Sequence, residues 1–75
     1  MDQDKLVIEV IGKVSGRHID FVKPEQELVA DLGIDSPKGL QLLAELEDRL
    51  KIEISDEEAA RMNKVSDVLE YVRGH

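Results

Sequence analysis

Asp31-Leu32-Gly33-Ile34-Asp35-Ser36 is the stretch that decides how this chain of 75 residues folds. Gly33 adopts a positive φ at little cost, so the chain can reverse direction there. Ile34 supplies an apolar anchor, and Ser36 followed by Pro37 is typical of a helix N-cap and the first helical position. The stretch therefore predicts a turn that opens a helix, with one exposed hydroxyl at its start.

Apolar residues at three- and four-residue steps predict helices on both sides of this turn. The first covers residues 3–15, and the second runs from Ser36 or Pro37 to about residue 51. Ser55 and Glu58 match a capping box that begins a short third helix, and the fourth covers residues 65–73. The third helix would carry Ala59 and Met62. The expected buried seam of the second helix is Leu40, Leu43, Leu46 and Leu50, with Leu42 beside it.

Residues 16–35 form a long connection for so small a domain, and such connections are often functional. A short turn of helix is expected over residues 25–31. The apolar side chains expected to hold the connection against the core are Ile19, Phe21, Leu28, Leu32 and Ile34. The fold class that follows is all-α, a small four-helix bundle of three main helices and one short helix. Residues 1–75 are expected to form a single domain.

The composition excludes several classes of function. The chain has 17 acidic and 10 basic residues, a formal net charge of −7, which disfavours binding to nucleic acid and favours basic protein partners. No cysteine is present, and His18 and His75 are too far apart in sequence to suggest a metal site. No apolar run could span a bilayer, and the acidic first residues do not resemble a secretory signal. We expect a cytoplasmic monomer that does not insert into membranes.

The hydroxyl of Ser36 has a purely structural explanation and a chemical one. A serine N-cap contributes about 1 kcal/mol to stability and needs no further function. No histidine lies near Ser36 in sequence, and a catalytic arrangement that includes His18 is disfavoured. The chain is therefore expected not to be an enzyme but to carry a reactive group. A serine at a helix start is accessible to a modifying enzyme, and a phosphodiester there would meet the positive end of the helix dipole.

The stretch 31–36 resembles the attachment motif of acyl carrier proteins, and residues 52–59 and 65–72 extend the resemblance. The resemblance implies that Ser36 bears 4′-phosphopantetheine, whose thiol holds acyl groups as thioesters for enzymes of fatty-acid or related specialised lipid and polyketide biosynthesis. It also implies modification by a phosphopantetheinyl transferase that recognises Asp35. Capping of the helix is an equal explanation for Asp35.

The resemblance further implies two surfaces. Glu47 and Asp48 would dock onto basic patches of acyl-transferring and chain-elongating enzymes, although a solvated helix face is the alternative. Lys38 and Gln41 would lie at the same partner surface, and they differ from the acidic residues that relatives often have there. The core would part to shelter an acyl chain, in a pocket formed by Leu43, Leu46, Ile54, Ala59, Met62 and Leu69.

Two further departures from the family pattern lie just after Ser36. Pro37 replaces the usual aliphatic residue, and Gly39 weakens the local helix propensity by roughly 1 kcal/mol relative to Ala. These differences favour altered partners or a slow or dedicated transferase. Two other functions remain open at this point, a peptidyl or aminoacyl carrier with the same arm and an unmodified helical adaptor.

Overall fold

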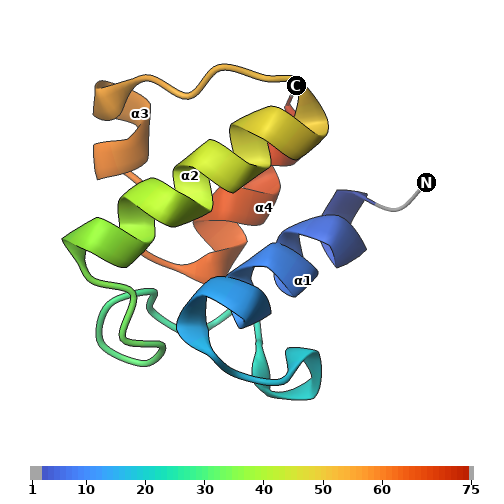
Figure 1. Ribbon diagram of the computed structural model, residues 1–75, viewed down its shortest axis with the longest axis vertical. Coiled ribbons are helices and arrows are strands. Elements are labelled where there is room, and N and C mark those ends of the chain that lie inside the picture. The colour runs from blue at the N-terminus through green and yellow to red at the C-terminus, as the bar shows by residue number, and fades with distance from the viewer. Residues whose placement is uncertain (1–2, 75) are drawn as a thin grey trace.

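The computed structural model describes residues 3–74, so Met1, Asp2 and His75 lie outside the described residues. Four α-helices and a 3₁₀ turn account for its regular structure, and these residues form no named strand (Figure 1). The elements are α1 (Gln3–Ser15), η1 (Ile19–Phe21), α2 (Ser36–Leu50), α3 (Asp56–Ala60) and α4 (Val65–Arg73). The predicted all-α bundle is confirmed, including the bounds of its first and last helices.

The core forms where α1, α2 and α4 meet and where the long connection folds against them. Valines and one isoleucine of α1 and α4 supply half of its buried residues. Their β-branched side chains have little rotamer freedom to lose on packing. The buried apolar residues of the helices are Val7, Val10, Ile11, Val14, Leu42, Leu46, Val65, Val68, Leu69 and Val72. Removal of their apolar surface from water is the main force that holds the bundle together.

The seam expected on α2 was partly wrong. Leu42 and Leu46 are buried, whereas Leu40 keeps 68% of its surface exposed. Leu43 and Leu50 are half-buried. Only one side of α2 packs on α1 and the core, so the leucine stripe is wider than the surface available to cover it.

The long connection differs from the expected one in two respects. Residues 25–31 form turns and not a helix, and the 3₁₀ turn lies earlier, at Ile19–Phe21. Phe21 is 65% exposed and Ile19 is 39% exposed, while Val22 takes the buried position. Leu28, Leu32 and Ile34 are buried, as expected.

Backbone hydrogen bonds tie this connection to the start of α4. The N–H of Leu28 donates to the carbonyl of Asn63 at 2.9 Å, and the N–H of Val65 donates to the carbonyl of Gln26 at 3.0 Å. Glu27 and Lys64 form an isolated antiparallel bridge between the same segments. These bonds hold the connection, and with it the turn that precedes α2, in a defined place, although the connection contains no α-helix.

Candidate functional site at the start of α2

The turn before α2 adopts the conformation expected from its glycine. Gly33 has a φ of +67°, a value that costs glycine little and other residues more. Ile34 is buried, and its N–H donates to the carbonyl of Leu28 at 2.9 Å. The turn is therefore anchored by an apolar side chain and by the backbone, and the next two residues are left at the surface.

Asp35, and not Ser36, is the N-cap of α2. Its carboxylate accepts a hydrogen bond from the N–H of Lys38 at 3.4 Å, and its backbone is extended. The expectation that Ser36 caps the helix was wrong, because the longer acidic side chain of Asp35 makes that bond. Ser36 becomes the first residue of α2, and Pro37 lies second, where its missing N–H costs no helical hydrogen bond. The expected capping role of Asp35 is observed.

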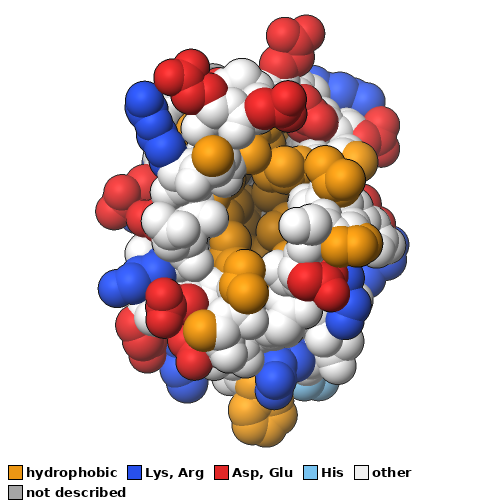
Figure 2. Space-filling view, turned by 90° about the vertical axis from the view of Figure 1, so that its left-hand side faces the viewer, with side chains coloured by type: hydrophobic (Ala, Val, Ile, Leu, Met, Phe, Trp, Pro, Cys, Tyr) orange, Lys and Arg blue, Asp and Glu red, His pale blue; other side chains and the backbone are white. Residues whose placement is uncertain are grey.

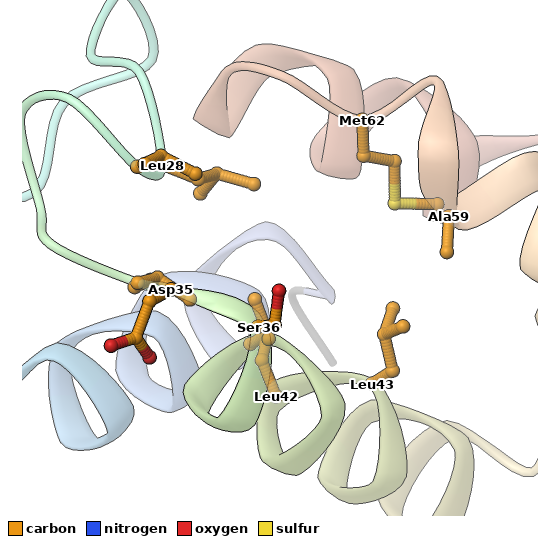
Figure 3. A pocket seen from close by; sticks show the side chains of 10 residues that line it. Leu28, Asp35, Ser36, Leu42, Leu43, Ala59 and Met62 are labelled. Atoms are coloured by element: carbon orange, nitrogen blue, oxygen red, sulfur yellow. The ribbon is translucent and has the colours of Figure 1, made fainter.

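The side chain of Ser36, which does not cap the helix, is exposed at the edge of a cleft. The cleft has a volume of about 190 Å³ and is mostly apolar. Figure 2 shows a hollow of hydrophobic side chains with charged side chains around its rim. In Figure 3 the hydroxyl of Ser36 points into the space between α2 and α3, whereas the carboxylate of Asp35 points away from it.

The long connection, α2, and α3 with the residues that follow it form the walls of this cleft. The sequence predicted only some of the residues that line it. Of the expected pocket residues, Leu43, Ala59 and Met62 line it. Leu46 and Leu69 are buried in the core, and Ile54 packs partly buried against that core; none of the three lines the cleft. Sequence reasoning missed the other apolar walls and the small residue between them, which are Leu28, Val29, Ile34, Gly39 and Leu42.

The long connection supplies several of the missed residues. The apolar character of Leu28 and Ile34 identified them as anchors of the connection. That they also line the cleft beside Ser36 depends on how the connection folds back. Met62 follows α3 and does not belong to it, since the helix ends at Ala60. Its side chain points from above toward Leu43 in Figure 3. A flexible thioether at this position can adapt to differently shaped contents.

Side-chain hydrogen bonds begin α3 and tie the segment before it to α4. Ser55 and Glu58 form the predicted capping box at its start. The hydroxyl of Tyr71 in α4 donates to the carbonyl of Glu53 at 2.9 Å, which ties the segment before α3 to the last helix. Loss of solvent, followed by the hydrogen bond and charge of Glu58 and the charge of Glu47, raises the pKa of Tyr71. The raised pKa extends to higher pH the range in which the phenol can donate this hydrogen bond.

The predicted partner residues lie on α2 but in different environments. Lys38, Gln41 and Asp48 are exposed, whereas Glu47 is half-buried. A carboxylate oxygen of Glu47 accepts a hydrogen bond from the N–H of Ile54 at 2.9 Å. Glu47 therefore has a structural role that the sequence did not reveal, because it joins α2 to the segment that leads into α3.

The structure brings no histidine of the described residues to Ser36. His18 lies at the start of η1, where its Nδ1 accepts a hydrogen bond from the N–H of Asp20 at 3.2 Å. It does not line the cleft. None of the helices formed by residues 3–74 combines the length and the apolar character needed to cross a bilayer.

Comparison with known proteins agrees with the geometry. A family profile described as the phosphopantetheine attachment site matches residues 5–72. An acyl carrier protein of Rickettsia bellii is 32% identical over 72 residues, which cover 96% of this chain and 84% of that protein. An acyl carrier protein of Desulforapulum autotrophicum is 41% identical over 64 residues, covering 85% and 83% respectively.

A solved structure shows the same fold. It belongs to a proposed acyl carrier protein of Mycobacterium tuberculosis, with a TM-score of 0.88, 33% identity and coverage of 97% of both chains. The all-α bundle, the turn that exposes a serine at the start of α2 and the profile match over nearly the whole chain agree. The chain belongs to the acyl carrier protein family, whose members carry acyl groups on 4′-phosphopantetheine.

Proposed function

We propose that Ser36 is the residue to which 4′-phosphopantetheine is attached. One observation carries this assignment: Ser36 is exposed at the first position of α2, and its hydroxyl points into an apolar cleft. Because Asp35 caps the helix, the Ser36 hydroxyl is not needed for that purpose. A transferase can then reach it without unfolding the first turn.

The surroundings of Ser36 suit a phosphodiester followed by a flexible arm. The positive end of the α2 dipole stabilises negative charge at the first helical residue. When bound, the arm supplies the thiol on which acyl groups are held as thioesters. Transfer from coenzyme A forms a bond between the Ser36 oxygen and phosphorus and breaks the pyrophosphate bond. The adenosine bisphosphate leaves, and a base of the transferase takes the hydroxyl proton.

The acidic residues of α2 support a proposal about partners. Asp48 is exposed, and the chain has a net charge of −7, so basic patches on partner enzymes would be attracted over several ångströms. Asp35 would be recognised by the transferase in addition to its capping role. Lys38 and Gln41 would modify the choice of partner, because they place positive and neutral groups beside the attachment point.

Within this proposal the protein is a monomeric carrier, not a catalyst. It would serve acyl-transferring and chain-elongating enzymes of fatty-acid or related specialised biosynthesis in the cytoplasm, and residues 1–75 would act as one domain. Weak, fast binding would let it serve several enzymes in turn. Loading assays with acyl and aminoacyl donors distinguish this cargo from that of a peptidyl carrier.

Intact mass tests the assignment of Ser36. The protein is incubated with coenzyme A and a broad-specificity transferase, and a gain equal to one phosphopantetheine is expected. Ser36→Ala should abolish the gain, while Ser66→Ala, at a half-buried serine in α4, should leave it unchanged. A full gain in Ser36→Ala, or no gain in the wild type with several transferases, would refute the proposal.

A further inference from the structure

Gly39 is a glycine without a structural explanation. It lies inside α2, where glycine destabilises a helix relative to alanine. Gly16 and Gly33 have positive φ values, and a Cβ on Gly12 would come within 2.9 Å of the carbonyl oxygen of Arg17. Gly39 has neither feature, because nothing lies within 4 Å of the position that its Cβ would occupy. Alanine would therefore fit and would strengthen the helix.

The open space at Gly39 belongs to the cleft. Ser36, Gly39 and Leu43 are spaced at helical positions i, i+3 and i+7, so they follow one another along a single face of α2. All three line the cleft. The missing side chain consequently widens the cleft between the Ser36 hydroxyl and the apolar wall at Leu43 and Met62.

The size of the cleft indicates what could occupy it. Its volume of about 190 Å³ is of the same order as that of engineered apolar cavities of roughly 150 Å³ that bind benzene. The core next to it is closed, since Leu46 is completely buried and Leu42 is 2% exposed. The cleft as it stands is therefore small and closed off by the core, which suits a compact group better than a long straight chain.

We propose that Gly39 is a specificity-determining residue that keeps the mouth of the cleft wide enough for short acyl groups with a branch or a ring. This inference rests on the proposed attachment at Ser36. A side chain at position 39 would narrow the mouth of the cleft. A branched acyl carbon is wider than a methylene, so the narrowing would affect it first. Straight chains of equal carbon number are less affected.

Two isomeric acyl groups provide the test, pentanoyl as the straight one and isovaleryl as the branched one. Each is loaded on the full-length chain from its coenzyme A thioester by the transferase, and intact mass confirms loading. The rate of thioester cleavage by hydroxylamine is then compared between the folded protein and the same protein unfolded in urea. The ratio of the two rates measures the shelter that the cleft provides.

The wild type is expected to protect both groups. Gly39→Ala should lower the protection of isovaleryl about tenfold, the effect of roughly two methylene-sized groups leaving an apolar site, and should leave that of pentanoyl unchanged. Gly39→Leu, which fills more of the mouth, should reduce both. The unloaded Gly39→Ala protein should have a higher Tm than the wild type, which shows that any lost protection is not unfolding.

Ala44→Leu is the matched control, because Ala44 is exposed on the same helix outside the cleft. It should leave both protection ratios unchanged. Three results would overturn the role of Gly39. They are equal protection of both isomers in wild type and Gly39→Ala, an equal loss for both in Gly39→Ala, and no protection in the wild type. Failure of the wild type to accept any arm would instead refute the attachment at Ser36, and intact mass shows this before any cleavage rate is measured.

Discussion

Arg73 in the last turn of α4 holds Asp4 in the first turn of α1. The Nε of Arg73 donates to one carboxylate oxygen of Asp4 at 3.2 Å, and a terminal guanidinium nitrogen donates to the other oxygen. These hydrogen bonds lower the pKa of Asp4, and the charge of Arg73 adds to the effect, while loss of solvent opposes it. The pair joins the two ends of the described chain across 69 residues.

The Asp4 pair predicts a specific dependence of stability on pH. Because the pKa of Asp4 is lower in the folded than in the unfolded state, its contribution is full above the unfolded value, near pH 4. It is lost as the pH falls through the lower folded-state pKa. Asp4→Asn should lower Tm at neutral pH and have a smaller effect at acid pH, measured by thermal unfolding.

Asp67 provides the comparison for this measurement. Hydrogen bonds from the N–H groups of Lys64 and Asn63 lower the pKa of Asp67. Protonation of Asp67 therefore lowers stability in the same acid range, and this loss should be equal in the wild type and Asp4→Asn. The difference between the two proteins isolates the pair. An equal Tm difference at pH 7 and at about pH 2 would contradict the assignment to Asp4.

Truncation of Leu46 should mainly lower stability, whereas truncation of Leu43 should mainly reduce the protection of a bound acyl group. Leu46 has none of its surface exposed, so Leu46→Ala should lower the free energy of unfolding by about 2–5 kcal/mol. Leu43 is half-buried and lines the cleft, so Leu43→Ala should cost less stability but reduce the protection of bound acyl groups. Chemical denaturation and hydroxylamine cleavage measure the two effects. A stable Leu46→Ala protein with lost protection would place Leu46 in the cleft after all.

Substitutions at Glu47 and Asp48 should distinguish a structural role from a role in docking. Asp48→Lys reverses an exposed charge and should slow turnover by partner enzymes at low salt, with no change in Tm. Glu47→Ala removes the acceptor for the Ile54 N–H and should cost roughly 1 kcal/mol of stability. Glu47→Gln keeps an acceptor oxygen and should retain most of it. Unchanged turnover by Asp48→Lys at all salt concentrations would exclude this residue from docking.

Pro37 is expected to affect the rate of modification. It is exposed at the second position of α2, beside the proposed attachment residue, and it offers a transferase less apolar surface than leucine. Pro37→Leu should therefore raise the rate of arm transfer from coenzyme A, followed by intact mass over time. Circular dichroism should show the same helix content in both proteins. Equal rates would mean that the transferase does not contact this side chain.

Local patterns predicted the secondary structure well where each helix carries its own signals. The bounds of α1 and α4, and the capping box of Ser55 and Glu58, follow from spacing and from neighbours three residues apart. The cap of α2 was harder, because Asp35 and Ser36 are both good N-cap residues. In the structure Asp35 is the cap, because its longer side chain accepts the hydrogen bond from the N–H of Lys38.

The sequence by itself determined the helical bundle, the turn at Gly33 and a serine at the start of α2, since these depend on contacts between near neighbours. Only the tertiary structure decided which leucines of α2 are buried, which side chains line the cleft and that Glu47 holds Ile54. A helical stripe shows which residues share a face but not how much of that face another element covers. The covered side of α2 came from its packing on α1 and the core. The connection reached the cleft because backbone hydrogen bonds hold it against the start of α4.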